Sequence, residues 1–279
     1  MNLKPATSGA KAALAAIVGA VLIWAAPASA HEFWLEAEDW TVEPGGTIRL
    51  DMRNGVEMKG PTFPWDARRV ARADLVAPSG TTPYEGRIGD MPAVRIEDAQ
   101  SGLNVMIFES KVTSLTYDRF ELFRKFTEEK ALDDALRTHL DERLPQNGLR
   151  EIYTRHTKAL IAVGDGAGED ADRGLDHELV ALTNPYTLAP GEPMRVRLLR
   201  DGAPVPDVRI TVFRRDDADE VTVAPYQTDG EGRIAFPLEA GSDYLVDNVY
   251  LRRTTRQELL EHTAIWASSW AALTFGVDG

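Results

Sequence analysis

Short apolar or alternating runs, separated at regular intervals by turn-forming residues, constrain the fold of this chain more than any other feature. In the first half the runs are Phe33–Leu35, Thr47–Met52, Val70–Val76, Ala93–Ile96 and Leu103–Phe108. Glycine, proline and serine clusters lie between them. Regularly spaced short strands with such turns are typical of an antiparallel β-sandwich. The first half of the chain is therefore predicted to be mainly β.

The last hundred residues repeat this pattern. The expected strands are Glu178–Leu182, Arg195–Leu199, Arg209–Arg214, Arg233–Leu238, Tyr244–Leu251 and Ala271–Val277. The order of the segments Gly202–Val212 and Thr228–Ile234 resembles a transthyretin-like, carboxypeptidase-regulatory type of β-sandwich. We therefore predict a mainly β protein with two antiparallel β-sandwich domains, Ig-like or transthyretin-like. The predicted domains cover residues 31–175 and 176–279.

Between the two β regions the hydrophobic period changes to three and four residues, which predicts a helical insert over about 119–163. A helix or helix pair is expected over about 119–144, where charged residues separate Phe120, Phe123 and Phe126 and then a series of leucines. A second helix is expected from Leu149 to Val163, because apolar residues recur there on one helical face.

The first thirty residues have the pattern of a secretory signal peptide. Lys4 and Lys11 precede the apolar run Ala12–Ala26, and Ala28-Ser29-Ala30 follows it. This is the order of basic region, apolar region and cleavage site that export signals share. The run is shorter than the roughly 20 residues that span a bilayer. We therefore expect cleavage after Ala30 and a periplasmic protein without stable membrane insertion.

Cleavage at that point would make His31 the first residue, which has chemical consequences. The free α-amine and the imidazole Nδ1 of one histidine can close a chelate ring on a metal ion. The amine has an ordinary pKa of about 7.7–8.0, so a divalent metal can displace its proton near neutrality. Imidazole nitrogen suits nickel, cobalt, copper and zinc. The sequence therefore predicts a divalent transition metal at His31, with further ligands from elsewhere in the fold.

Composition excludes several other classes of protein. The chain has no cysteine, which rules out disulfides, thiolate metal sites and thiol catalysis. Its net charge of −13 argues against a nucleic-acid partner, because phosphate contacts need clustered Lys and Arg. Neither a nucleophile elbow nor a P-loop nor a helical zinc-binding histidine pair is present. We therefore expect a binding protein rather than an enzyme.

Four further histidines are candidates for additional ligands or for structural roles. His177 lies between two acidic residues, His262 follows an acidic helical stretch, and His156 lies on the predicted second helix. His139 is expected on a solvated helix face. Trp266 and Trp270 are expected in the core, although their spacing also fits a sugar-stacking platform.

Several stretches together resemble a periplasmic component family associated with cobalt and nickel transport, long catalogued as a domain of unknown function. The stretches are Ala30–Glu36, Tyr153–Leu160, Gly174–Val180 with Asn184–Tyr186, Pro204–Val212, Thr228–Phe236 and Trp266–Phe275. The resemblance implies a secreted β-sandwich that binds nickel or cobalt near its amino terminus, with an integral-membrane transporter component as a possible partner. By position, His31 is the first-choice ligand.

One departure from that family concerns the late strand. Related sequences often have a histidine there, where this chain has Tyr250. His177, His262 and His156 remain as candidates for the missing ligand.

Two alternatives stay open. A copper histidine-brace oxidase would also use His31, together with a second histidine on the same copper. A metal-free binding or scaffold module would instead dock a protein or a glycan, for which exposed Trp266 and Trp270 would be the sign.

Overall fold

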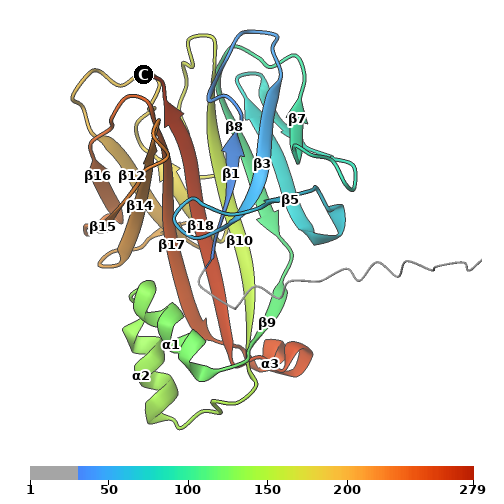
Figure 1. The fold of residues 1–279 in the computed structure, drawn as a ribbon, viewed down its shortest axis with the longest axis vertical. Helices are drawn as coiled ribbons and strands as arrows, with labels where there is room; N and C mark the ends of the chain where they lie inside the picture. The colour runs from blue at the N-terminus through green and yellow to red at the C-terminus, as the bar shows by residue number, and fades with distance from the viewer. Residues whose placement is uncertain (1–30) are drawn as a thin grey trace, which may run out of the picture.

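The computed structural model describes residues 31–279, and the predicted signal peptide over residues 1–30 lies outside the described residues. The described chain is mainly β, with three short α-helices gathered at one end, as Figure 1 shows. None of the helices in this part of the chain is long and apolar enough to cross a membrane. The predicted fold class is confirmed.

A large central sheet forms the middle of the molecule. Its path runs through β15 (Val221–Gln227), β14 (Arg209–Asp216), β17 (Ser242–Arg253), β18 (Trp266–Val277), β10 (Leu149–Val163), β8 (Gly102–Ser110), β5 (Val70–Ala77) and β6 (Gly80–Pro83). Two short strands, β2 (Thr41–Val42) and β9 (Thr113–Tyr117), also pair with β10. Most neighbours are antiparallel, but β10 and β18 run parallel.

Two smaller sheets cover the central sheet. The N-terminal sheet contains β1 (Glu32–Ala37), β3 (Ile48–Gly55), β4 (Thr62–Phe63) and β7 (Val94–Ile96). The C-terminal sheet contains β11 (His177–Ala181), β12 (Met194–Arg200), β13 (Ala203–Pro204) and β16 (Arg233–Phe236).

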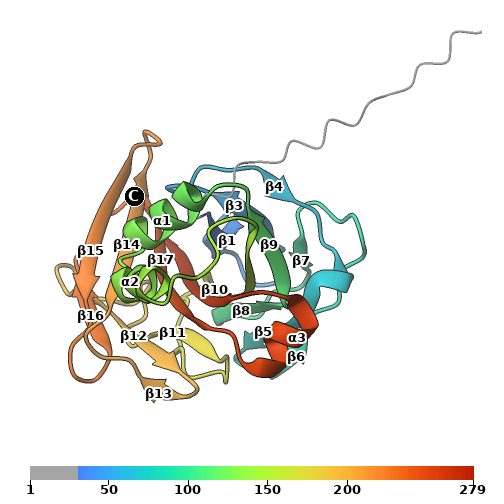
Figure 2. The same ribbon diagram turned by 90° about the horizontal axis from the view of Figure 1, so that it is seen from below.

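The alternation of side chains along β18 shows how the three sheets are layered. Ala271, Leu273 and Phe275 pack into the core shared with the C-terminal sheet. Ala272 instead packs beside Trp34 of β1, and the Thr274 hydroxyl donates a hydrogen bond to the Leu35 carbonyl at 2.7 Å. Because successive strand residues point to opposite faces, the two smaller sheets lie on opposite sides of the central sheet (Figure 2).

The predicted second helix, Leu149 to Val163, is wrong, because this segment is the long strand β10. Its residues from His156 to Val163 are all buried. A strand covered on both faces loses the alternation of apolar and polar residues, so its pattern cannot be told from that of a buried helix. The helical insert is therefore shorter than expected.

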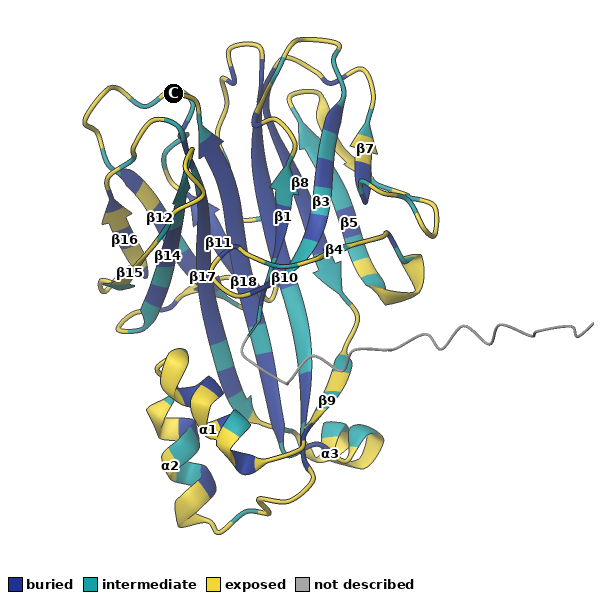
Figure 3. Cartoon of the chain, viewed as in Figure 1, coloured by how far each residue is buried: buried dark blue, intermediate teal, exposed yellow. Residues whose placement is uncertain are grey.

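The helix pair predicted over about 119–144 is confirmed. It forms α1 (Phe120–Glu129) and α2 (Asp133–Asp141), which are separated by Ala131 with a positive φ of 54°. A third helix, α3 (Arg256–His262), begins at a capping box made by Thr255 and Glu258. Figure 3 shows that the outer faces of α1 and α2 are exposed, whereas the upper parts of β10, β17 and β18 are buried.

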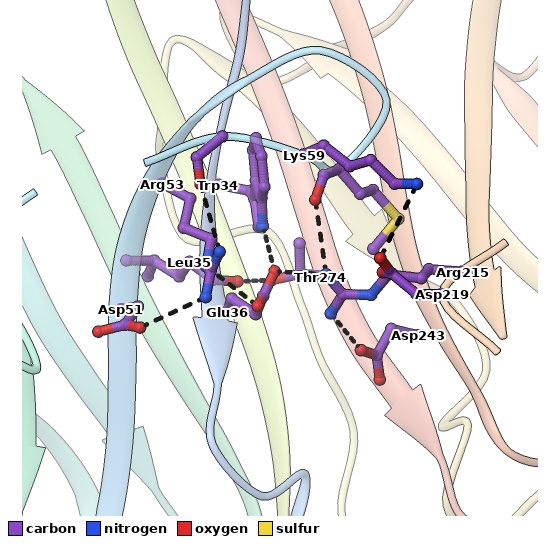
Figure 4. A network of polar contacts seen from close by, with 12 residues as sticks. Trp34, Leu35, Glu36, Asp51, Arg53, Lys59, Arg215, Asp219, Asp243 and Thr274 are labelled. Carbon is purple, nitrogen blue, oxygen red and sulfur yellow. Dashed lines mark hydrogen bonds and ion pairs between the residues drawn. The ribbon is translucent and has the colours of Figure 1, made fainter. Parts of the chain in front are cut away.

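Strands from both predicted domains are direct neighbours in the central sheet. β10 belongs to the predicted domain 31–175, and its partner β18 belongs to 176–279. An ion-pair network adds a second connection between distant segments, as Figure 4 shows: Arg215 of β14 contacts Glu36 of β1 at 3.2 Å and Asp243 of β17 at 2.6 Å. The division at residue 175 stays a prediction.

Candidate functional site

His31 lies at the start of β1, directly before the first pair of the ladder with β3. Its side chain is half-buried, and its backbone carbonyl accepts a hydrogen bond from Nη1 of Arg155 at 2.9 Å. Burial lowers the pKa of the His31 imidazole, and the nearby charge of Arg155 lowers it further, while the charge of Glu129 opposes both. A neutral ring keeps the nitrogen lone pair that a metal ion needs.

Next to His31 a buried lysine neutralises two carboxylates. Lys130, directly after α1, contacts Glu32 at 2.5 Å and Asp247 at 2.8 Å, and its ammonium lies 5.1 Å from the ring centre of Trp270. Burial acts to lower the pKa of Lys130, but the charges of Asp247 and Glu32 outweigh it and the pKa is raised. The ammonium therefore lies between these carboxylates, in the position that a bridging cation would need.

Two of the other candidate ligands lie away from His31, and the first is on the opposite face of the central sheet. Arg155 and His156 are adjacent in β10, so their side chains point to opposite faces. His156 is 3% exposed, and its Nε2 lies 3.1 Å from the Thr154 hydroxyl. Burial lowers the pKa of His156 to about 4. His156 is therefore separated from His31 by the sheet itself.

His177, the second candidate, is the first residue of β11, as expected, and an oxygen atom lies close to each of its ring nitrogens. Nδ1 lies 3.0 Å from the carbonyl of Ser269, and Nε2 lies 2.9 Å from Oδ1 of Asn248. Burial, followed by the nearby charge of Arg200, lowers its pKa to about 3. This histidine holds β11 against β17 and β18, which is a structural role.

The remaining two histidines lie near the helices. His262 is the last residue of α3, and its Nε2 is 3.9 Å from a carboxylate oxygen of Glu261. The expectation of a solvated His139 is wrong, because it is fully buried and its Nδ1 accepts a hydrogen bond from Trp266 Nε1 at 3.0 Å. The ring of Phe120 lies 4.9 Å away, so aromatic packing buries the helix face that carries His139.

The five histidines therefore do not converge on one point. Within residues 31–279 no group of three or more His, Cys, Asp or Glu side chains is arranged to hold a metal ion. The negative charge of Glu129 acts on the His31 ring, but this carboxylate is itself paired with Lys125 at 3.4 Å.

The sequence pattern did not identify all of the residues that surround His31. Arg155 lies in the stretch Tyr153–Leu160, although nothing in the pattern assigned it a contact with His31. Lys130 directly follows an amphipathic helix, where a lysine is ordinarily exposed, so the sequence carried no sign of its burial. A charged residue that is buried by tertiary packing leaves no periodic trace.

Trp266 and Trp270 pack in the core, as predicted, with exposed fractions of 2% and 5%. Trp270 stacks on Phe126 with ring centres 5.7 Å apart. Their burial counts against a sugar-stacking platform. The ring centre of Tyr250 lies 3.3 Å from the guanidinium of Arg200, and Tyr250 lines a cavity together with His156.

Comparison with known proteins gives a family but no activity. A family model described as "Domain of unknown function (DUF4198)" matches residues 28–251. No curated protein matches the chain. The chain is similar at 13% identity and a TM-score of 0.19 to a solved structure described as "Crystal structure of tetra-tandem repeat in extending region of large adhesion protein". That similarity covers 87% of this chain and 50% of the other, so this chain spans half the length of that structure. Because the family model matches most of its length, the chain belongs to the family described as domain of unknown function DUF4198.

Proposed function

We propose that this protein is exported to the periplasm and captures a divalent transition metal at the amino terminus created by cleavage after Ala30. Nickel and cobalt are the favoured metals, with copper and zinc as alternatives. The observation that carries the proposal is the position of His31. It directly follows the cleavage motif in the sequence and directly precedes β1 in the fold.

The surroundings of His31 support metal binding in two ways. Its imidazole is half-buried rather than covered, and its lowered pKa keeps the ring neutral and able to coordinate. The hydrogen bond from Arg155 fixes the backbone of the same residue. A fixed backbone reduces the ordering cost of closing a chelate between the α-amine and Nδ1.

The same surroundings limit how tightly the metal is held. The positive charge of Arg155 opposes a second cation, and Glu129 is the carboxylate that offsets it. A site with two nitrogens, one nearby carboxylate and water would hold its ion reversibly. Reversible capture suits an accessory protein in nickel or cobalt uptake or homeostasis, which passes its cargo to an integral-membrane transporter component.

A copper histidine brace needs a second histidine on the face that carries His31. Among the described residues His156 is on the other face, and His177 has an oxygen within 3.0 Å of each ring nitrogen. Nδ1 of His139 is occupied by Trp266. These positions count against a second copper ligand at His156, His177 or His139.

Calorimetric titration of the secreted protein with nickel and with cobalt, preceded by intact-mass determination, tests the proposal. We expect a mass that corresponds to a start at His31 and one bound metal ion. His31→Ala should remove most of the binding, whereas His262→Ala, a change to a histidine at the end of α3, should leave it unchanged. Unchanged nickel binding in folded His31→Ala protein would contradict the proposal.

A further inference from the structure

A cavity of about 340 Å³ lies where the N-terminal sheet meets the lower part of β8 and β10. Its wall includes four aromatic residues and a methionine, which are Phe33, Phe63, Phe108, Tyr153 and Met52. The rings of Phe33 and Phe108 lie 5.2 Å apart at a tilt of 38°. A concave, mainly apolar cavity with a few polar groups is the usual form of a small-molecule site.

Arg155 provides the charged group in this cavity. Its guanidinium lies 4.1 Å from the ring centre of Trp270 and 5.2 Å from that of Tyr153, so it is held between two aromatic side chains. One N–H donates to the His31 carbonyl. No carboxylate of residues 31–279 lies within 4.0 Å of Arg155, whereas Lys130 nearby has two such partners.

Arg155 therefore has N–H donors left for a ligand, because one N–H is bonded to the His31 carbonyl and no carboxylate in the described part of the chain contacts the others. A guanidinium carries five N–H donors in a planar fork that matches the two oxygens of a carboxylate. Burial disfavours the charged guanidinium, and the charges of Asp247, Glu151 and Glu32 offset part of that cost without touching it; a carboxylate in direct contact would offset more. The aromatic contacts hold the fork in place, so less freedom is lost when an anion binds.

The other polar groups of the cavity fit an anionic ligand with an apolar body. Asp66 is the acidic residue in the wall, and its carboxylate is already paired with Arg68 at 2.8 Å and with Arg69 at 3.8 Å. Arg69 and Arg155 also line the cavity, so the charged residues of its wall carry one positive charge more than negative, although the chain as a whole has a net charge of −13. Asn54 also lines the cavity, and its buried Oδ1 has no hydrogen-bond partner among the described residues.

We propose that this cavity binds a small organic carboxylate with a flat, apolar body. The carboxylate pairs with the Arg155 guanidinium, and the body lies among Phe33, Phe108 and Tyr153. This inference is separate from metal capture, because none of its contacts requires a metal ion or a free α-amine at His31.

Titration with benzoate, in the presence of a chelator that removes metal, tests the proposal. Benzyl alcohol is the matched probe, since it has the same ring without the charge. We expect benzoate to bind about tenfold or more tightly than benzyl alcohol, the range that a charge-assisted hydrogen bond contributes. Equal affinity for the two probes, or no binding of benzoate up to its solubility limit, would overturn the proposal.

Two variants locate the site. Arg155→Gln should weaken benzoate binding about tenfold or more, the range expected for loss of a charge-assisted hydrogen bond. Arg200→Gln is the control, because Arg200 also lies against an aromatic ring but lines the cavity on the opposite face. Unchanged binding in folded Arg155→Gln protein would overturn the assignment.

Arg155→Gln removes a buried contact and can impair folding. A second variant therefore changes an exposed residue of the cavity wall. Phe63 is 39% exposed and lines the cavity, so Phe63→Trp should narrow it without touching Arg155. We expect weaker benzoate binding, while Leu260→Trp, at a residue of α3 that is 74% exposed, should have no effect. Full benzoate affinity in Phe63→Trp would show that the probe binds elsewhere and would refute the proposed site.

Discussion

The guanidinium of Arg155 donates a hydrogen bond to the backbone carbonyl of His31 across 2.9 Å, although the two residues are 124 positions apart in the sequence. This contact ties the start of the described chain to the middle of the longest strand. It also makes Arg155 the residue shared by the proposed metal site and the proposed carboxylate cavity, since its guanidinium reaches His31 and lines the cavity.

Removing the charge of Lys130 should destabilise the fold strongly. Lys130→Met would leave Glu32 and Asp247 buried without their common partner, and breaking a buried pair in this way costs about 3–5 kcal/mol. Urea unfolding followed by circular dichroism measures the loss. Lys125→Met, on the exposed side of α1, is the control and should change the free energy of unfolding by less than about 0.5 kcal/mol. Similar losses in the two variants would contradict the burial of Lys130.

Replacing Glu151 should change how stability depends on pH. Burial raises the pKa of this carboxyl above its ordinary value of 4.5, while hydrogen bonds from Ser268 and Tyr117 act in the opposite direction. The folded state therefore keeps a proton that the unfolded state has already released. The stabilising contribution is complete below pH 4.5 and is lost as the pH rises through the folded-state pKa.

Glu151→Gln cannot ionise, so the variant should gain stability relative to wild type as the pH rises from 4.5 to neutral. The free energy of unfolding in urea, measured over that range for both proteins, checks this. A difference between variant and wild type that does not change with pH would show that the Glu151 carboxyl is not perturbed by burial.

His177→Leu should lower stability without changing nickel affinity. The neutral ring has one N–H, so the change leaves one of its two oxygen neighbours, Oδ1 of Asn248 or the carbonyl of Ser269, without that donor, at about 1–3 kcal/mol for a buried unsatisfied group. Thermal unfolding measures the first effect and calorimetric titration the second. Loss of nickel binding in a folded His177→Leu protein would place this histidine in the metal site and contradict its structural role.

The ion pairs of Arg215 should stabilise the contact between the N-terminal and central sheets. Arg215 contacts both Glu36 and Asp243, and all three side chains are at most 28% exposed. Arg215→Ala should cost about 1–3 kcal/mol, because charged groups of limited exposure lose their partner. Arg95→Ala, which removes an exposed pair with Glu97, should cost no more than about 1 kcal/mol. Equal effects in urea unfolding would refute the structural importance of the network.

Much of the fold was predictable because its short strands carry a local signal. The runs at Thr47–Met52 and Tyr244–Leu251 correspond to β3 and β17, where turn residues mark the ends. The helix pair was also predictable, since its aromatic and leucine residues follow the helical period. These signals depend only on residues close in sequence.

The wrong predictions concern segments whose burial depends on tertiary packing and not on the local sequence pattern. β10 is covered on both faces, so its apolar residues no longer alternate. His139 looked solvated because charged residues flank it, yet Phe120 and Trp266 bury it from other parts of the chain. The contacts of Arg155 and Lys130 likewise join segments far apart in the sequence, which no single-sequence period records.

The most direct test of the proposed metal site compares two forms of the protein that differ only at the amino terminus. Both begin at His31, and one of them carries an acetyl group on its α-amine. Nickel is titrated into each by calorimetry at neutral pH. If the α-amine and imidazole of His31 chelate the ion together, acetylation removes one of the two donors, and nickel affinity should fall at least about tenfold, the range already seen when an outer-shell partner of a metal ligand is lost. Equal affinity in the two forms would contradict the proposed amino-terminal site.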